Sequence, residues 1–100
     1  MNGNVTAVLR LDGPLTMTTV SGFVQAGRAR AAAGDLTVDL SGVTAADSAA
    51  LALLFDWLRA ARGASHRMTL SGVPAGLRSL AALYGVDELL PAQAPAASTQ

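Results

Sequence analysis

Asp47 and Ser48 are the residues of this chain best placed for chemistry, because an apolar helical pattern begins at this point. Residues 47–54 are Asp-Ser-Ala-Ala-Leu-Ala-Leu-Leu. A side-chain oxygen at the start of a helix can accept hydrogen bonds from backbone N–H groups that lack helical partners. A hydroxyl there also faces the positive end of the helix dipole, where a phosphate or a partner's anionic group is favoured. Ser48 can therefore act as a cap, a switch or a docking point.

Candidate catalytic groups are sparse elsewhere. His66 is the only histidine and lies in a polar segment before a predicted strand. A hydrolase that uses Ser48, His66 and an aspartate stays open, because triads assemble in space, although Ser48 lacks the Gly-x-Ser-x-Gly turn of α/β-hydrolases. Asp39 and Asp47 flank a predicted strand exit and could hold a metal, but strand-end and cap roles are commoner. We therefore expect no enzyme activity, no metal and no cofactor.

Composition excludes several classes of protein. The chain has 100 residues, a formal net charge of zero, seven basic residues that are all arginine, and no cysteine. Nucleic-acid binding needs clustered cations, and Walker-type phosphate loops and Schiff bases need lysine. Without cysteine there are no disulfides or thiolate metal sites. The N-terminal residues do not resemble a signal peptide, and no apolar run approaches the ~20 residues of a membrane span. We expect a single cytoplasmic domain.

Hydrophobic periodicity predicts strands that alternate with helices. Strands are predicted at 5–11, 36–40 and 68–71, and helices at about 18–33, 48–62 and 74–84, with at most one further turn at 86–90. Asp12-Gly13-Pro14 is predicted as a turn and 41–46 as a loop. Because parallel strands need helical crossovers, the pattern predicts one α/β domain over 1–91, with a small, mostly parallel β-sheet packed with α-helices. Residues 92–100, rich in Ala and Pro, are expected to be a disordered tail.

The helical spacing also predicts which side chains are buried. Leu51, Leu54 and Leu58 are expected to pack against the sheet, and Leu83 is expected to face inward from the last helix. Trp57 shares the spacing of the second helix and is expected in the core or at its edge.

The chain resembles the STAS family, the domain shared by anti-sigma factor antagonists and the tails of sulfate transporters. The resemblance covers about residues 5–91 and is carried by residues 47–54. In the family, this segment is a strand that ends in Asp, followed by Ser or Thr, a small residue, Gly and Leu at the start of a helix. Residues 38–43 (Val-Asp-Leu-Ser-Gly-Val) and 68–73 (Met-Thr-Leu-Ser-Gly-Val) are similar to two further strand exits of the family. The resemblance implies a single STAS-like domain of α/β class.

Within the family, the chain looks most like the MlaB-type subunits. These are the cytoplasmic STAS components of the ABC transporter that maintains lipid asymmetry of the Gram-negative outer membrane. Residues 80–86 and 89–91 carry this similarity. It implies a non-catalytic subunit that binds the transporter's ATPase, so that the protein is peripheral to the inner membrane. The expected partner-binding residues surround the phosphoacceptor-like Ser48 and are Thr16, Met17, Asp47, Ser48, Ala49 and Ala50.

The chain departs from the family pattern at three points. The family glycine is Ala50, and the acid that closes a Gly-Glu-Leu-Asp turn is Thr16, with Pro14 in place of the glutamate. Loss of that acid argues against phosphorylation, but an anti-sigma factor antagonist switched by phosphorylation of Ser48 remains the alternative. The chain also begins at what would be the family's second strand. One sheet edge is therefore expected to be bare, which invites homodimer formation.

Overall fold

A computed structural model describes residues 7–91 and shows one parallel sheet with the strand order β1-β2-β3. The strands are β1 (Ala7–Leu15), β2 (Leu36–Ala46) and β3 (Met68–Ser71). The helices are α1 (Val24–Ala33), α2 (Ser48–Gly63) and α3 (Ala75–Leu83), with short 3₁₀ turns η1 (Val20–Gly22) and η2 (Asp87–Leu89). The predicted single α/β domain with a parallel sheet is confirmed.

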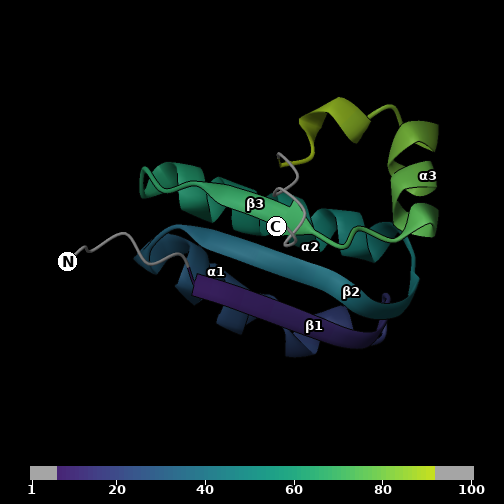
Figure 1. The fold of residues 1–100 in the computed structure, drawn as a ribbon, viewed down its shortest axis with the longest axis horizontal. Helices are drawn as coiled ribbons and strands as arrows, with labels where there is room; N and C mark the ends of the chain where they lie inside the picture. The colour runs from purple at the N-terminus through teal and green to yellow at the C-terminus, as the bar shows by residue number, and fades with distance from the viewer. Residues whose placement is uncertain (1–6, 92–100) are drawn as a thin grey trace, which may run out of the picture.

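Helices α1 and α2 lie against one face of the sheet, and α3 lies at one end (Figure 1). The central strand β2 supplies the middle of the core, since Leu36, Val38 and Leu40 are fully buried. From α2, Leu54 and Trp57 have no exposed surface. The predicted burial of Leu51 and Leu54 and the core position of Trp57 are confirmed, while Leu58 is only half-buried.

Strands β1 and β2 are longer than the sequence predicts. The predicted turn at 12–14 is part of β1, and the predicted loop at 41–46 is part of β2. Gly13 adopts φ +82°, which a glycine tolerates without strain, and it lies at one of the irregular points of the pairing. Two register shifts between the strands take up extra residues on β2. The turn signals were wrong because parallel pairing between the two strands overrides them. Residues 5 and 6 of the predicted first strand lie outside the described residues.

The first and last helices also differ from expectation. The helix predicted over 18–33 begins only at Val24, after the separate turn η1. Leu83 was expected to face inward, but 78% of it is exposed. It is the last residue of α3 and contributes nothing to the core, which α3 reaches through Leu77 and Ala81. The single turn predicted at 86–90 is confirmed as η2.

The second face of the sheet is mostly polar, with Val8 as an exposed apolar exception. Arg10, Thr37, Asp39 and Thr69 alternate with the buried residues of their strands, and neither α1 nor α2 covers them (Figure 1). The Thr37 and Thr69 hydroxyls lie 2.9 Å apart and hydrogen-bond to each other. Parallel sheets usually have both faces covered, so an open polar face is uncommon for this architecture. Among residues 7–91, no helix has the length and apolar character needed to cross a membrane.

Candidate functional site

The Asp47 carboxylate fixes the entry to α2. Its Oδ1 accepts a hydrogen bond from the Ala49 backbone N–H at 2.9 Å, which makes Asp47 the N-cap of the helix. Its Oδ2 accepts from the Met17 backbone N–H at 3.0 Å. One side chain therefore caps α2 and holds the segment after β1 beside it. The prediction that Asp47 or Ser48 caps this helix is confirmed for Asp47.

Ser48 is the first residue of α2, and its side chain is exposed. Its hydroxyl has no hydrogen-bond partner within residues 7–91, and the capping role belongs to Asp47. The position leaves the hydroxyl at the positive end of the α2 dipole. Ser48 is therefore an exposed serine at the N-terminus of α2.

The segment 16–19 forms a small hydroxyl-lined turn beside Ser48. The Thr19 hydroxyl accepts from the Thr16 backbone N–H at 2.8 Å and donates to the Pro14 carbonyl at 2.9 Å. This turn orients Met17 outward, and 76% of Met17 is exposed. An exposed methionine that is fixed through its backbone offers an adaptable apolar contact.

Beside the α2 entry lies an apolar hollow of about 220 Å³ between α2 and the η1–α1 segment. Its lining residues are Val20, Val24, Arg28, Ala49, Ala52, Leu53 and Asp56. Arg28 closes one end, where its Nη2 lies 2.9 Å from Asp56 Oδ2. The small side chains Ala49 and Ala52 keep the hollow open. We call Met17, Val20, Ser48, Ala49 and Ala52 the α2-entry surface.

The predicted contact residues do not all lie on this surface. Met17, Ser48 and Ala49 do, while Asp47 supports it through the two hydrogen bonds already described. Thr16 is half-buried and shapes the turn. Ala50 was also expected to contact a partner, but it has no exposed surface. It lies about 100° around α2 from Ala49 and points into the core, so its side chain does not reach the surface.

Sequence reasoning missed Val20, Val24, Ala52 and the Arg28–Asp56 ion pair. The spacing could have indicated two helix faces. Ala49, Ala52 and Asp56 share one side of a helix, and Val20 and Val24 are four residues apart. The pairing of α1 with α2, which brings the two sets together, is tertiary and does not follow from the spacing.

The Ser48–His66 catalytic pair that the sequence left open does not assemble. Ser48 begins the 16-residue helix α2, and His66 follows its end. At 1.5 Å per residue the helix alone separates them by about 24 Å. His66 Nδ1 instead lies 3.4 Å from the Ala31 carbonyl oxygen. This separation rules out a hydrolase built on these two residues.

Asp39 and Asp47 are likewise not arranged as metal ligands. Asp39 Oδ1 accepts from both the backbone N–H and the hydroxyl of Ser41, at 3.0 and 2.7 Å, and Asp39 Oδ2 lies 3.4 Å from Arg10 Nη1. The Ser41 hydrogen bonds and then the Arg10 charge lower the pKa of Asp39. Within residues 7–91 no three His, Asp or Glu side chains gather in a way that could hold a metal.

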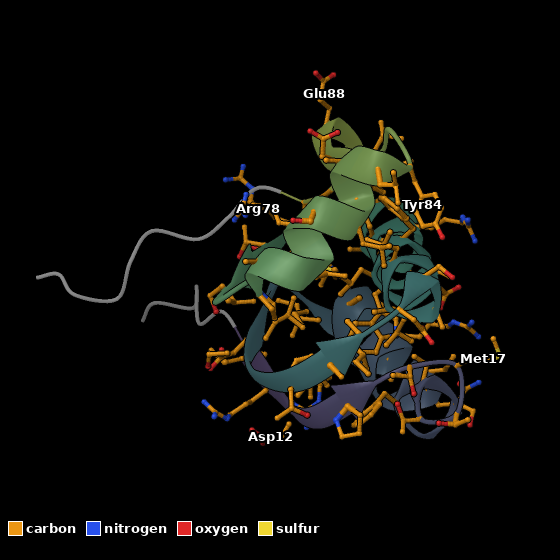
Figure 2. The ribbon with its side chains drawn as sticks, turned by 90° about the vertical axis from the view of Figure 1, so that its right-hand side faces the viewer. Asp12, Met17, Arg78, Tyr84 and Glu88 are labelled. Carbon is orange, nitrogen blue, oxygen red and sulfur yellow. The ribbon has the colours of Figure 1, made fainter. Side chains whose placement is uncertain are left out.

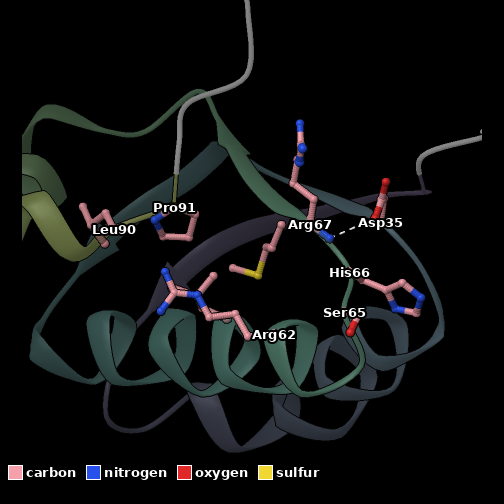
Figure 3. Close-up of a pocket in the computed structure, with 9 residues that line it drawn as sticks. Asp35, Arg62, Ser65, His66, Arg67, Leu90 and Pro91 are labelled. Atoms are coloured by element: carbon pink, nitrogen blue, oxygen red, sulfur yellow. Dashed lines mark hydrogen bonds between the residues drawn. The ribbon is translucent and has the colours of Figure 1, made fainter.

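The arginines near the end of α2 do not converge on an anion site. A hollow of about 540 Å³ lies there between α2, the start of β3 and Leu90. In Figure 3, Arg62 lies in this hollow, while the side chains of Arg67 and His66 point away from it. The hydrogen bond drawn there joins the Arg67 backbone N–H to Asp35 Oδ1 at 2.8 Å. A dipole-compensating and solvated role fits Arg62 better than ligand binding.

Comparison with known proteins supports the fold and identifies the family. A solved structure described as the anti-sigma factor antagonist SpoIIAA in its unphosphorylated form is similar, with a TM-score of 0.64 and 19% sequence identity. The match covers 96% of this chain and 84% of that one, and at this identity it establishes the fold alone. No curated protein matches significantly. A family model described as "Mlab, STAS domain" matches residues 2–91. The chain therefore belongs to the STAS domain family.

Proposed function

We propose that this protein is a non-catalytic STAS subunit that binds and regulates the cytoplasmic ATPase of a phospholipid ABC transporter. In this role it maintains outer-membrane lipid asymmetry and stays peripheral to the inner membrane through its partner. The name of the matching family model supports the MlaB type of STAS domain. STAS domains in general are regulatory or interaction domains, which agrees with the separation of Ser48 from His66.

The observation that carries the proposal is the α2-entry surface. It combines an exposed Met17, an exposed hydroxyl at Ser48 and a small-residue hollow at Ala49 and Ala52. A partner helix that lays an apolar side chain into the hollow would bury Met17 and come within hydrogen-bonding reach of Ser48. This is the helix-in-groove mode of recognition. The Arg28–Asp56 pair at the end of the hollow adds a polar rim.

The second candidate is an anti-sigma factor antagonist that phosphorylation of Ser48 releases from its partner. The exposure of Ser48 at a helix N-terminus favours it, because a phosphate there meets the positive end of the dipole. The adjacent Asp47 carboxylate opposes it, because both of its oxygens face this same entry. Thr16 also stands where the family pattern carries an acid.

Partner capture separates the two functions. The full chain, tagged and expressed in its native host, is expected to co-purify with an ABC-type ATPase identified by mass spectrometry. Recovery of an anti-sigma kinase alone, or stoichiometric phosphate on Ser48, would overturn the transporter role in favour of the second candidate.

A matched pair of serine variants tests the surface. Ser48→Arg is expected to abolish ATPase binding measured by calorimetry, because a long charged side chain blocks the hollow. Ser48→Ala is expected to weaken binding by only about 1 kcal/mol, the contribution of a neutral hydrogen bond. Ser79→Arg, on the exposed side of α3, is the control and should bind normally. Circular dichroism checks the fold of each variant. Unchanged affinity of Ser48→Arg would place the interface elsewhere.

A further inference from the structure

We propose that the α2-entry surface selects an acidic amphipathic helix, in which an aspartate or glutamate lies one helical turn from the apolar side chain that fills the hollow. The carboxylate of that residue binds between Arg28 and Arg59, at the end of the hollow. This inference rests on the proposed docking role of the surface and names the kind of segment that docks there.

The helices that form the surface are basic in a chain that is neutral overall. Helices α1 and α2 carry four arginines, Arg28, Arg30, Arg59 and Arg62, but a single acid, Asp56. The turn η1, which also borders the hollow, carries no charge. Because the chain has as many acids as arginines, the excess of acids lies on its other segments. A positive face of this kind attracts an acidic partner and orients its approach.

At the end of the hollow, two arginines share one carboxylate. Arg28 Nε and Nη2 both donate to Asp56 Oδ2, at 3.1 and 2.9 Å. Arg59 Nη1 lies 3.9 Å from Asp56 Oδ1, and the Arg59 side chain is 81% exposed. Within residues 7–91 the Nη1 group of Arg28 has no acceptor. Asp56 therefore balances one of the two guanidinium charges, and N–H donors remain for a second carboxylate.

The hollow and the two arginines are separated by one helical turn. Ala52 lines the hollow, and Asp56, which holds Arg28, lies four residues later on α2. At 1.5 Å per residue this is about 6 Å along the helix axis. Side chains three or four residues apart on a partner helix span a similar distance. A helix that runs along α2 therefore brings its acid to the arginines when its apolar side chain lies over Ala52.

The charge pattern also fixes the end of the surface at which the acid lies. Asp47 is at the start of α2, and its two oxygens already accept from the Met17 and Ala49 N–H groups. A partner carboxylate at that end would meet a like charge. At the other end it meets two cations and one anion, while a lysine or arginine of the partner would be repelled. An acid near Arg28 and Arg59 is thus the complement of this surface.

Peptide selection tests the preference without the ATPase. A phage library of helical peptides is selected on the immobilised full chain, and enriched peptides are expected to carry a large apolar residue with an acid three or four positions away. On the variant Arg28→Glu/Arg59→Glu, a lysine or arginine is expected to replace that acid. Arg30→Glu/Arg62→Glu is the matched control. It makes the same charge change on the same two helices outside the hollow and should still select acids.

Calorimetry measures the contribution of the acid in one enriched peptide. Replacing the acid by its amide is expected to weaken binding to the wild type about tenfold, because charge-assisted hydrogen bonds are lost. The same replacement should weaken binding to Arg28→Ala/Arg59→Ala by less than about twofold. Circular dichroism checks each fold, and Arg59→Glu, at an exposed side chain, is the second variant if a double variant does not fold; it should also reduce the acid preference. No enrichment, enrichment without acids, or equal losses in both proteins would overturn the inference.

The docking role and this inference fail separately. Acid-selective peptides combined with no ATPase binding would overturn the transporter role and leave the acid preference of the surface in place. ATPase binding that Ser48→Arg abolishes and Arg28→Glu/Arg59→Glu leaves unchanged would overturn the acid preference and leave the docking role in place.

Discussion

At the scale of single residues, the side chain that organises the site is Asp47 and not the more chemically suggestive Ser48. The motif at 47–54 predicted that one of the two caps α2, and helix signals alone could not choose between them. The structure chooses Asp47 because its two oxygens satisfy two backbone donors at once, those of Met17 and Ala49. Ser48 is thereby left exposed.

Asp47→Ala is expected to destabilise the fold by about 2 kcal/mol, since it removes an N-cap and a second hydrogen bond to a charged acceptor. Urea unfolding followed by circular dichroism measures the change. Ser48→Ala serves as the control and should change the stability by less than about 0.5 kcal/mol, as expected for an exposed position. Equal losses in the two variants would show that the cap is shared.

Asp39 gives the open face of the sheet a pH dependence. Its pKa is lowered in the folded protein by the Ser41 hydrogen bonds and by Arg10. A lowered folded pKa means that the carboxylate stabilises the fold above its unfolded pKa of about 3.9, and that this contribution disappears as pH falls through the folded value.

Asp39→Asn is therefore expected to be less stable than the wild type at pH 7, by less than about 1 kcal/mol because the group is partly solvated. The difference should begin to shrink as pH falls to about 4 and should disappear once pH is below the lowered folded pKa. Thermal unfolding between pH 7 and pH 2 measures the difference, and a gap that stays constant with pH would contradict the assignment.

At the scale of elements, most of the fold followed from periodicity, but the lengths of β1 and β2 did not. Strong turn signals at 12–14 and at Ser41-Gly42 are local, whereas the pairing of β1 with β2 that overrides them joins residues far apart in sequence. The packing of α1 on α2 could not be predicted from the sequence pattern either. Trp57 of α2 is buried beneath α1, where its Nε1 donates to the Val24 carbonyl at 3.0 Å. The hollow of the site exists because of this packing.

Gly27 allows α1 to approach Trp57. A Cβ at Gly27 would overlap the indole ring, so Gly27→Ala is expected to cost about 1–3 kcal/mol through overpacking. Gly76 in α3 has no atom within 4 Å of the same position, so Gly76→Ala is expected to stabilise the protein by up to about 1 kcal/mol. Chemical denaturation followed by Trp57 fluorescence measures the free energy of unfolding of both variants. Helix propensity alone favours alanine at both positions. A gain in stability for both variants would therefore mean that α1 can shift on α2 to make room for the added methyl group.

At the scale of the whole molecule, the large exposed apolar side chains other than Val8 on β1 lie in two distant regions. Met17 lies beside the α2 entry, while Tyr84 and the η2 residue Glu88 lie toward the opposite end in Figure 2. Leu83, Tyr84 and Leu89 are 78%, 56% and 61% exposed in that second region. Either region could attract a partner on apolar exposure alone. The first region also carries a hydroxyl at a helix N-terminus and a hollow lined by small residues. The hollow beside Leu89 is lined instead by larger side chains such as Phe55 and Arg59.

Met17 and Leu83 form a matched pair for locating the partner, because their exposed fractions are 76% and 78%. Neither contributes to the core, so Met17→Ser and Leu83→Ser should both fold with nearly unchanged stability. Met17→Ser is expected to weaken ATPase binding about tenfold, because a buried contact of ~1.5 kcal/mol is lost from the interface. Leu83→Ser should leave the affinity unchanged. Calorimetric titration of each variant measures the difference, and the reverse order of effects would move the interface from the α2-entry surface to the α3–η2 end.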